Sequence, residues 1–252
     1  MLDLNGDGPV DIEDLQILIG HWGQNEPSVD IAPAPLGDGV VDANDLQVLM
    51  RHWGQDATFV AHWKLDETGG DIVYDSIAEN DAVVKGNALW QRESGQVDGA
   101  LQLDGINDYV KTPYVLNPSE SAFSVFVWVK GGESGQSILS QEEGAHWLLT
   151  DAQGCVGSAL VGIGGRGAGG PLMSETVVTD GLWHRIGFVW DRSYRSLYVD
   201  DELVATDVIE QLNFPDRQGG LFIGAGKDRE SDTLWSGLID DVRIYDRAVI
   251  SQ

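Results

Sequence analysis

The chain has 252 residues, with 41 Asp and Glu against 15 Lys and Arg, and a formal net charge of −26. A negative excess this large repels nucleic acid and anionic membranes and attracts divalent cations, so we expect no nucleic-acid partner. No apolar run approaches the ~18 residues that a membrane-spanning helix needs, which predicts no membrane insertion. The length leaves room for one medium domain and one small domain.

The first motif is a run of oxygen-bearing side chains near the N-terminus. Residues 3–14 read Asp-Leu-Asn-Gly-Asp-Gly-Pro-Val-Asp-Ile-Glu-Asp. In a calcium loop with this spacing, alternate side chains converge on one hard cation, and a glycine at position 6 allows the sharp turn. The alternative is a polar turn that caps a helix. The spacing predicts Ca²⁺ ligands at Asp3, Asn5, Asp7, the carbonyl of Pro9, Asp11 and Asp14.

A helix is predicted directly after this loop, and the loop and helix then recur. Leu15, Leu18 and Trp22 fall on one helical face. Residues 11–24 match residues 42–55, and both copies end in His-Trp-Gly-Gln. An internal repeat of this kind indicates two copies of one structural unit.

The second copy departs from the first at the start of its loop. It keeps later ligand positions at Asp38, Val40, Asp42 and Asp45. The places of the first two ligands fall on Ala34 and Leu36, which cannot bind a cation through their side chains. Two interpretations stay open: the loop is longer and Asp30 supplies the first ligand, or the second site is weak. The prolines between Asp30 and Asp38 would stiffen a longer loop and lower the entropy cost of ordering it.

Two calcium loop-helix units without an entering helix, each with Asp-Leu-Gln-x-Leu, resemble dockerin type I modules. The resemblance covers residues 2–55 and implies a small all-α, EF-hand-type module in which Ca²⁺ is part of the fold. It also implies a cohesin-like domain, or a neighbouring domain, as the partner. Loop positions 10 and 11 carry partner choice in dockerins. Here they are Ile12/Glu13 and Ala43/Asn44, which differ between the repeats and depart from the usual Ser/Thr pairs.

From residue 60 onward the sequence changes to short segments with strand patterning. Period-2 alternation and β-branched or aromatic residues recur, separated by Gly, Asn and Asp. Many short strands without interleaved helices favour an antiparallel β-sandwich, and Asp200-Asp201 predicts a tight hairpin. The predicted strands are Phe59–Leu65, Ile72–Tyr74, Ala100–Leu103, Tyr109–Thr112, Ser124–Lys130, Gln136–Ser140, His146–Thr150, Val156–Ile163, Trp183–Asp191, Ser196–Val199, Leu203–Thr206, Gly220–Gly224 and Gly237–Tyr245.

The order of short motifs in this region resembles a laminin-G-like jelly roll of the concanavalin A-like lectin/glucanase superfamily. The motifs include His-Trp-Lys-Leu-Asp-Glu at 62–67, the Asp-Gly-Ile-Asn-Asp-Tyr-Val run ending at 110, and Gly-Leu-Ile-Asp-Asp-Val-Arg-Ile-Tyr at 237–245. The fold class we predict is therefore mainly β. The domains are residues 1–56 (calcium-binding module), 57–61 (connector) and 62–252 (β-sandwich).

The jelly-roll resemblance implies two curved antiparallel sheets and often a structural calcium near the paired terminal strands. Glu67, Asp75 and Asp240 are the residues that the resemblance assigns to that ion. The alternative is that Asp240 and the adjacent Asp241 are ordinary strand-edge acids with arginine partners. Both interpretations stay open.

The sequence offers no catalytic pair. Sandwich enzymes of this superfamily cleave glycans with two glutamates in an E-x-D-x-x-E pattern, which is absent here. Glu142 and Glu143 are adjacent, so on a strand they point to opposite faces and cannot form a facing carboxyl pair roughly 5–9 Å apart. No G-x-S-x-G nucleophile turn is present. We therefore expect a protein that is not an enzyme.

Together these features predict a non-catalytic extracellular calcium-binding fragment for adhesion or assembly, whose jelly roll binds a polysaccharide or an extracellular protein. The alternative is a non-catalytic part of a large secreted glycoside hydrolase or other polysaccharide-degrading enzyme. Sugar rings stack on exposed aromatic side chains, so Trp90, Trp147 and Trp235 are candidate ligand contacts, with core packing as the alternative for each. Because Met1 runs straight into the calcium loop, we expect a secreted or cell-surface fragment whose signal peptide lies elsewhere.

Overall fold

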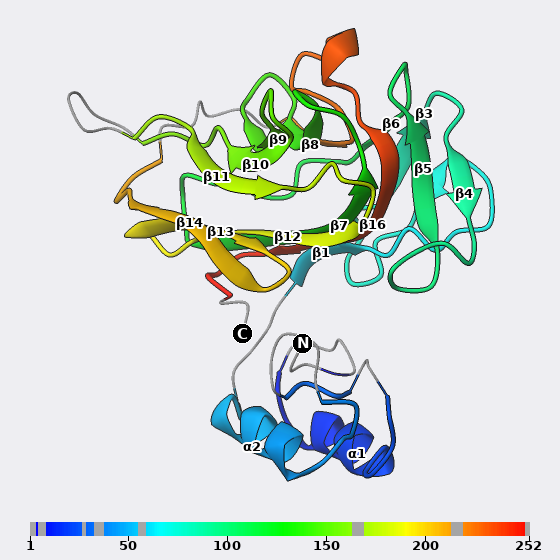
Figure 1. Cartoon of the computed structure of the whole chain (residues 1–252), viewed down its shortest axis with the longest axis vertical. Helices are drawn as coiled ribbons and strands as arrows, with labels where there is room; N and C mark the ends of the chain where they lie inside the picture. Colours follow the sequence, from blue (N-terminus) through cyan, green and yellow to red (C-terminus); the bar gives the residue numbers. More distant parts are fainter. Residues whose placement is uncertain are drawn as a thin grey trace. The chain divides into compact units, whose positions relative to one another are not determined.

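The computed structural model describes residues 4, 9–26, 29–32, 38–54, 59–162, 169–212 and 219–249. The chain divides into two compact units, Met1–Phe59 with Ser251–Gln252, and Val60–Ile250 (Figure 1). Within the described ranges, no helix has the length and apolar character needed to cross a membrane.

The N-terminal unit contains two helices with matching starts, α1 (Ile12–Gly20) and α2 (Ala43–Arg51). Asp11 and Asp42 are the N-cap residues, and each accepts a hydrogen bond from a backbone N–H of the first turn. The side chains of Asp14 and Asp45 accept hydrogen bonds from the backbone N–H groups of these N-cap residues, which completes a capping box at each helix. The repeated sequence therefore gives two helices of nine residues; a complete all-α dockerin module stays a prediction.

Each helix of this unit ends against the loop of the other repeat. The N–H of Gly23 donates to the carbonyl of Val41 over 2.8 Å, and the N–H of Gly54 donates to the carbonyl of Val10 over 2.8 Å. Val10 and Val41 are buried, and they share a small core with Leu18, Val29 and Leu49. The two repeats therefore close reciprocally, and each one completes the other.

The second unit is a sandwich of two antiparallel sheets, drawn as two layers in Figure 1. The first sheet has eight strands in the order β14-β13-β12-β7-β16-β5-β4, with β1 paired to β16. Its strands are β1 (Phe59–Trp63), β4 (Leu89–Gln91), β5 (Ala100–Asp104), β7 (Phe123–Gly131), β12 (Trp183–Trp190), β13 (Tyr194–Val199), β14 (Glu202–Val208) and β16 (Ser236–Tyr245).

The second sheet also has eight strands, in the order β11-β10-β9-β8-β15-β6-β3-β2. Its strands are β2 (Ile72–Val73), β3 (Ala82–Lys85), β6 (Tyr109–Lys111), β8 (Ser137–Gln141), β9 (His146–Thr150), β10 (Cys155–Ser158), β11 (Leu172–Val177) and β15 (Leu221–Ile223). The predicted mainly β antiparallel sandwich is thus confirmed.

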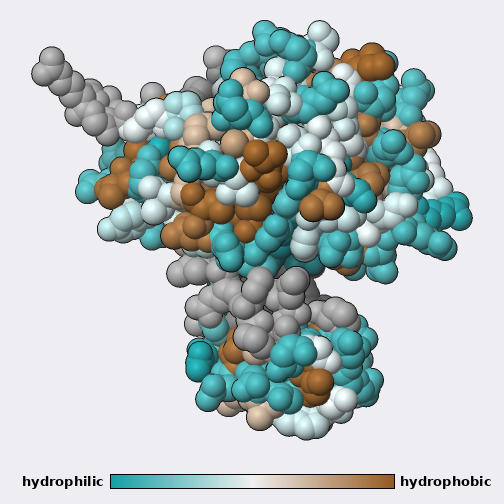
Figure 2. Space-filling view, viewed as in Figure 1, coloured by the Kyte–Doolittle hydropathy of each residue, from teal (hydrophilic) through white to brown (hydrophobic). Residues whose placement is uncertain are grey.

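The core between the sheets is built from alternate strand residues that point inward. Phe123 lies near its centre, with its ring centroid 5.1 Å from Trp147 and 5.6 Å from Phe188. Trp63 and Trp190 are also fully buried in the same cluster. Hydrophilic side chains cover most of the face shown in Figure 2, and hydrophobic ones gather there in smaller groups. Burial of these aromatic side chains, together with the aliphatic side chains around them, stabilises the unit.

The sequence prediction omitted three strands and made a fourth too long, because the strand predicted at Val156–Ile163 ends at Ser158 in β10. The prediction omitted β3 and β4, which have four and three residues and are too short for a clear period-2 pattern. It also omitted β11, which reads Leu-Met-Ser-Glu-Thr-Val and pairs along only one side, with β10. The hairpin at Asp200-Asp201 is confirmed: both residues have positive φ, +51° and +66°, as the tight turn between β13 and β14 requires.

A buried arginine fixes one edge of the sandwich. The side chain of Arg195 on β13 is fully buried. Its Nε donates to Oδ1 of Asp207 on β14 over 2.8 Å, and its Nη2 pairs with Asp207 Oδ2. Its remaining guanidinium N–H groups donate to the carbonyls of Leu160 and Gly170. One side chain therefore holds both β14 and the segment that enters β11.

We predict that Arg195→Met lowers the free energy of unfolding by about 3–5 kcal/mol, because Asp207, the buried carbonyl of Leu160 and the carbonyl of Gly170 lose their donor. Urea unfolding followed by tryptophan fluorescence measures the change. The exposed Arg192 is the control position, and Arg192→Met is expected to stay within about 0.5 kcal/mol of wild type. Equal effects of the two substitutions would contradict the role of Arg195.

Candidate functional site

The described halves of the two N-terminal loops carry buried carboxylates with backbone donors. Asp14 accepts hydrogen bonds from the N–H groups of Leu4 (2.6 Å) and Asp11 (2.8 Å). Asp45 occupies the same position in the second repeat and accepts from Ile31 (2.7 Å), as well as from two further N–H groups. The two repeats therefore match in the hydrogen bonds of the last loop position, Asp14 and Asp45, as well as in sequence.

Asp30 lies beside the later positions of the second loop, and its role as a first ligand stays a prediction. Its carboxylate accepts hydrogen bonds from the N–H groups of Asp38 (3.3 Å) and Gly39 (2.6 Å). The side chain of Asp38 accepts in turn from the N–H of Val40 (3.1 Å). Asp30 and the later ligand positions therefore belong to one folded loop. Asp3, Asn5 and Asp7 of the first loop lie outside the described residues.

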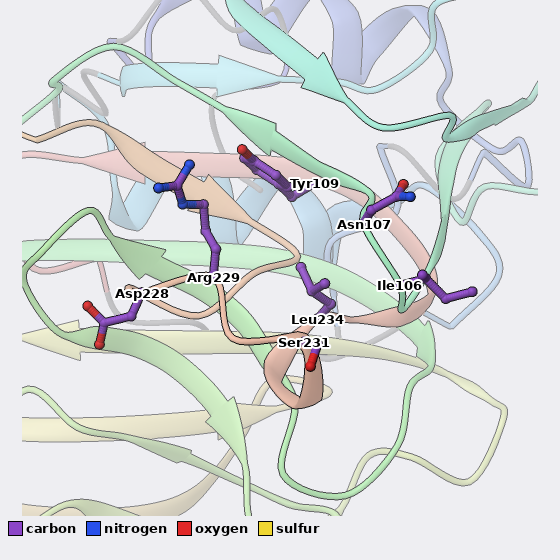
Figure 3. A pocket seen from close by; sticks show the side chains of 7 residues that line it. All are labelled: Ile106, Asn107, Tyr109, Asp228, Arg229, Ser231 and Leu234. Carbon is purple, nitrogen blue, oxygen red and sulfur yellow. The ribbon is translucent and has the colours of Figure 1, made fainter.

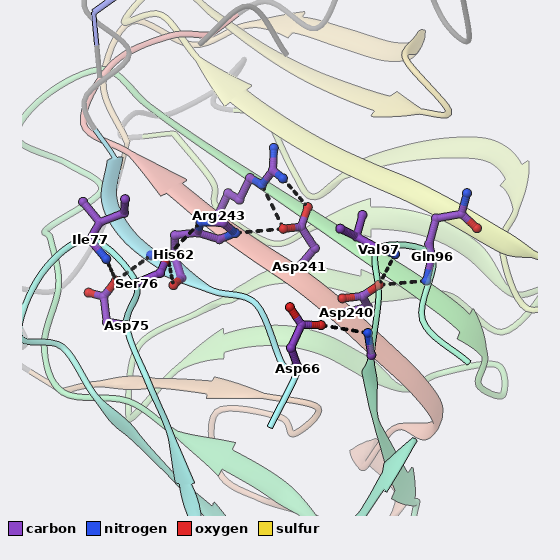
Figure 4. Close-up of polar contacts among 11 residues, drawn as sticks. His62, Asp66, Asp75, Ser76, Ile77, Gln96, Val97, Asp240, Asp241 and Arg243 are labelled. Atoms are coloured by element: carbon purple, nitrogen blue, oxygen red, sulfur yellow. Dashed lines mark hydrogen bonds and ion pairs between the residues drawn. The ribbon is translucent and has the colours of Figure 1, made fainter. Parts of the chain in front are cut away.

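A second set of carboxylates gathers where β16 meets the segments on either side of it (Figure 4). Asp240 on β16 is fully buried, and its Oδ2 accepts hydrogen bonds from the N–H groups of Gln96 and Val97, both 2.8 Å. Its Oδ1 is buried without a hydrogen-bond partner. Asp66 lies beside it and accepts a hydrogen bond from the N–H of Gly99 over 2.8 Å.

Burial governs the electrostatics of this pair. Desolvation raises the pKa of Asp240 to about 8, and the negative charges of Asp241 and Asp66 add to the rise against the N–H groups of Val97 and Gln96. Desolvation likewise raises the pKa of Asp66 above its ordinary value, and Asp98 raises it further. Both carboxyl groups therefore favour a bound proton or a bound cation over a free negative charge.

The backbone around the pair is held in unusual conformations. Leu65, Asp98 and Asp241 all have positive φ, +62°, +56° and +53°, although none is glycine. A Cβ at Gly95 would lie 1.9 Å from the carbonyl oxygen of Gly99, so only glycine fits there. Non-glycine residues in the left-handed region cost free energy and cluster at functional sites. The segments that carry Leu65, Asp98 and Asp241 therefore pack closely against one another around Asp66 and Asp240.

The other two residues assigned to this ion lie in different surroundings. The carboxylate of Asp75 accepts hydrogen bonds from the N–H groups of His62 (2.9 Å) and Ile77 (3.1 Å) and from Nδ2 of Asn80 (2.9 Å). Oε1 of Glu67 accepts a hydrogen bond from the N–H of Tyr74, and its buried Oε2 has no hydrogen-bond partner.

Carboxylates near the terminal strands are thus arranged differently from the sequence assignment. Among the described residues, no group of three or more His, Cys, Asp or Glu side chains is placed to hold a metal ion. The structure places Asp66 beside Asp240, and does not bring Glu67, Asp75 and Asp240 into one such group. Asp66 and Glu67 are adjacent, and the sequence alone gave no sign of which one faces β16.

Asp241 has an arginine partner, as the strand-edge alternative predicted, and it also has a histidine partner. Its Oδ1 lies 2.8 Å from Nε2 of His62 and accepts from Nε of Arg243 over 3.0 Å, and its Oδ2 lies 2.9 Å from Arg243 Nη2. Burial raises the pKa of Asp241, but the charges of Arg243 and His62 outweigh it and hold the pKa below its ordinary value. Nδ1 of His62 lies 3.0 Å from the Ser76 hydroxyl, so this network ties β1 and the segment after β2 to β16.

A cleft of about 340 Å³ lies elsewhere on the jelly roll, between two connections that cross from one sheet to the other (Figure 3). One wall is the turn between β5 and β6, and the other is the segment between β15 and β16. The lining residues are Ile106, Asn107, Tyr109, Asp228, Arg229, Ser231 and Leu234.

An aromatic cluster supports this cleft. The ring of Tyr109 meets the buried ring of Phe222 edge-on, with centroids 5.4 Å apart. The guanidinium carbon of Arg229 lies 5.5 Å from the Phe222 centroid, and the side chain hydrogen-bonds to Tyr109. Figure 3 shows Arg229 extending toward Tyr109 from the opposite wall. A ring and a planar cation are therefore fixed side by side at the surface.

Hydrogen bonds also shape the wall between β5 and β6. Oδ1 of Asp104 accepts from the N–H groups of Ile106 (2.8 Å) and Asn107 (3.2 Å). Desolvation raises the pKa of Asp104, but these backbone donors outweigh it, so that the pKa lies below the ordinary value. Asp108 is buried and accepts from the N–H of Asn87 over 2.6 Å. The turn is thus held in place by its own side chains.

Burial rules out two of the three sugar contacts expected from the sequence, and the third, Trp90, stays a prediction. Trp147 and Trp235 are both 0% exposed, so neither ring can stack on a ligand; both belong to the core. Trp90 is half-buried, packs against the core and donates its indole N–H to the carbonyl of Gly70 over 3.0 Å. Arg229 was missed because its segment carries no strand or motif pattern; its approach to Tyr109 depends on the fold.

The sequence profile of the concanavalin A-like lectin/glucanases superfamily matches residues 104–252. The chain belongs to this superfamily. No curated protein sequence matches it. The profile begins at the end of β5, so residues 60–103 are placed in the sandwich by the structure and not by the profile.

Solved structures of low sequence identity share the fold of this superfamily member. Domain 4 of AbnA, a GH43 extracellular arabinanase from Geobacillus stearothermophilus solved with arabinotriose, has a TM-score of 0.54 at 19% identity, covering 78% of this chain and 99% of that domain. The binding domain of Paraclostridial Mosquitocidal Protein 1 has a TM-score of 0.58 at 14% identity, covering 76% of this chain and 49% of that chain. A Trypanosoma rangeli sialidase mutant displaying trans-sialidase activity has a TM-score of 0.55 at 16% identity, covering 95% of this chain and 38% of the other. This chain therefore spans about half the length of the mosquitocidal binding domain and less of the sialidase.

The raised pKa of Asp240 predicts a specific pH dependence in cation-free buffer. Its folded pKa of about 8 exceeds the ordinary 3.8, so unfolding releases a proton between these values and stability falls as pH rises through that window. The slope reaches up to about 1.4 kcal/mol per pH unit. Asp240→Asn keeps an acceptor for Gln96 and Val97 but removes the charge. The variant is expected to lose this decline and to exceed wild type in stability near the upper end of the window.

Urea unfolding in EDTA, repeated across this pH range, tests the prediction. The exposed Asp246 gives the matched control, and Asp246→Asn is expected to keep the wild-type slope. A decline of the same size in Asp240→Asn and wild type would show that Asp240 is not its source.

Proposed function

We propose that the jelly-roll unit is a non-catalytic carbohydrate-binding module whose ligand lies in the cleft beside Tyr109. The observation that carries the proposal is the pairing of an aromatic ring with polar groups in one surface cleft. Tyr109 and Ile106 offer apolar surface to a sugar ring, and Asn107, Arg229 and Ser231 offer hydrogen bonds to its hydroxyl groups. Ligand sites generally combine apolar surface with a few convergent polar groups.

The structural relatives support a binding role of this kind. Domain 4 of the arabinanase was solved with a bound arabino-oligosaccharide, and the mosquitocidal protein fragment is described as a binding domain. The arabinanase domain also favours a second candidate function for this chain, a non-catalytic part of a larger secreted polysaccharide-degrading enzyme. Both candidates use the same cleft, and they differ in what the module is attached to.

The choice of binding over cleavage rests on the carboxylates near the cleft. Glycosidases generally use two carboxyl groups that flank the scissile bond. Among the described lining residues only Asp228 carries one. Glu142 is held by Lys111, whose Nζ lies 2.8 Å from both carboxylate oxygens. Glu143 has a positive φ of +56° and follows β8 in a turn.

We predict that Tyr109→Ala weakens glycan binding by about tenfold, because a sugar that covers roughly 60 Å² of the Tyr109 ring gains about 1.5 kcal/mol from apolar burial. A glycan array identifies ligands, and calorimetry with those ligands and with arabinotriose measures the affinity. Tyr194, an exposed tyrosine on β13, supplies the control Tyr194→Ala, which is expected to bind as wild type does. Glycan binding that survives Tyr109→Ala unchanged would place the site elsewhere.

We further propose that the N-terminal unit binds Ca²⁺ through its two loops and joins the protein to a partner, either a cohesin-like domain or a neighbouring domain. This makes the whole chain a secreted or cell-surface fragment for adhesion or assembly. The support is the contact of Asp30 with Gly39 and the matching hydrogen bonds of Asp14 and Asp45. Clustered carboxylates of this kind repel one another until a cation neutralises them.

We extend the calcium proposal to the terminal strands, where two buried carboxylates support it. Oδ1 of Asp240 is buried without a partner, and the adjacent Asp66 also has a raised pKa, so a hard cation would replace the missing hydrogen bond and the missing countercharge. Asp240 and Asp66 would hold the ion, which supplies positive charge in this site. Both residues already hold the segment before β5, through the N–H groups of Gln96, Val97 and Gly99.

We expect Ca²⁺ at about 100 times its dissociation constant to raise the free energy of unfolding by about 2.7 kcal/mol per independent site. Asp38→Ala removes one ligand position of the second loop, at an exposed side chain, and is expected to lose most of the gain from that loop. Glu13→Ala removes an exposed carboxylate that is not among the predicted ligands, and the gain should persist. Calorimetric titration and thermal unfolding with and without EDTA measure both. No heat and no thermal shift in wild type would reject the calcium proposal.

A further inference from the structure

We infer that the Tyr109 cleft selects a neutral sugar with adjacent hydroxyl groups and discriminates against carboxylated sugars. The inference rests on the proposed carbohydrate-binding function of the same cleft and names the class of ligand that it takes. It follows from which charged groups of the cleft already have partners.

One guanidinium, of Arg229, and one carboxylate, of Asp228, line the cleft. Among the described residues, no carboxylate forms an ion pair with Arg229, which is held by Tyr109 and the face of Phe222. Asp228 lines the same cleft and pairs with Lys227. A guanidinium donates two parallel hydrogen bonds to neighbouring oxygens, and a carboxylate accepts hydroxyl protons. Two adjacent hydroxyl groups provide both the oxygens and the protons, so a neutral diol satisfies both residues.

An anionic sugar would meet a single guanidinium in this cleft, with the carboxylates of Asp228, Glu230 and Asp232 on the same segment. Lys111 lies 5.6 Å from the Phe222 ring centroid, but both of its hydrogen bonds go to Glu142. Residues 227–232 carry two cations, Lys227 and Arg229, against three carboxylates. Arg229 is therefore the one cation left for a ligand among the described residues that line the cleft.

The surrounding charge acts against acidic ligands as well. Besides Asp228, the segment carries Glu230 and Asp232, and both are exposed. They belong to a chain with a net charge of −26, so an approaching polyanion meets repulsion from the cleft rim as well as from the whole surface. Neutral glycans pay no such cost. Distant charges are screened at physiological ionic strength, which leaves the cleft rim as the main source of discrimination.

The shape of the cleft limits how much sugar it holds. A volume of about 340 Å³ lies near the lower end of the roughly 300–1,000 Å³ typical of ligand pockets. Its walls are fixed by turn hydrogen bonds: the N–H of Arg229 donates to the carbonyl of Gly226 over 2.9 Å, and the N–H of Thr233 donates to the carbonyl of Glu230 over 3.0 Å. A short stretch of neutral glycan matches this rigid site.

The test compares neutral glycans with matched carboxylated forms. The probes are glucan, mannan and galactan oligosaccharides, each printed beside the form whose primary alcohols have been oxidised to carboxylates, together with arabinotriose. We expect the full chain to bind neutral probes in a Tyr109-dependent way and the carboxylated forms at least about tenfold more weakly. A carboxylated form bound as tightly as its neutral partner, with loss in Tyr109→Ala, would overturn the inference and leave carbohydrate binding intact. Binding to no probe of either kind would overturn both.

A charge-reversal pair separates the cleft from the overall charge. Asp228→Lys changes the net charge by two units at the cleft, and Glu202→Lys makes the same change at an exposed position on the edge strand β14. We expect Asp228→Lys to weaken neutral binding and to shift the carboxylated-to-neutral affinity ratio upward on the order of tenfold. Glu202→Lys should leave the ratio near its wild-type value. Equal shifts in both variants would assign the discrimination to net charge and overturn the role of the cleft.

Discussion

The jelly roll depends on two neighbouring carboxylates that β16 buries. Consecutive residues of a regular strand point to opposite faces, so one of them would normally face solvent. The register between β16 and β7 shifts between Asp240 and Arg243, and Asp241 has a positive φ of +53°. This irregularity lets Asp240 and Asp241 both be buried, at 0% and 5% exposure. Asp241 then reaches His62 on β1, and Asp240 reaches the segment before β5.

The pairing of β16 with β5 also positions the cleft. Ser236 at the start of β16 pairs with Asp104 at the end of β5, and the turn after Asp104 forms one wall. A Cβ at Gly105 would lie 2.7 Å from Cβ of Ser236, and φ there is +73°, so this close approach requires glycine. The other wall is the segment that leads into β16. Both walls are therefore fixed by the same strand that buries the carboxylates, which is why the lining is rigid without belonging to the core.

The sequence predicted what local pattern determines and missed what depends on distant contacts. The sandwich and the hairpin at Asp200-Asp201 follow from strand periodicity and turn chemistry, and both are confirmed. Trp147 was a candidate ligand contact, but a large aromatic residue reads the same in a core strand and at a surface, and only packing against Phe123 decides between them. Arg229 acquires its role from Phe222 and Tyr109, which approach it only after the sheets have closed.

The acidity of the chain is not one uniform property, because hydrogen bonding gives its buried carboxylates different chemistry. Asp75 accepts hydrogen bonds from backbone and amide donors and serves as a structural acceptor. Asp241 forms an ion pair with a guanidinium, which offsets the free-energy cost of burying its negative charge. Asp240 receives two N–H groups on one oxygen and no hydrogen bond on the other, so a negative charge on it would be only partly compensated. A response to protons or divalent cations should therefore concentrate where an oxygen is buried without a partner, and not where acidic residues are most numerous.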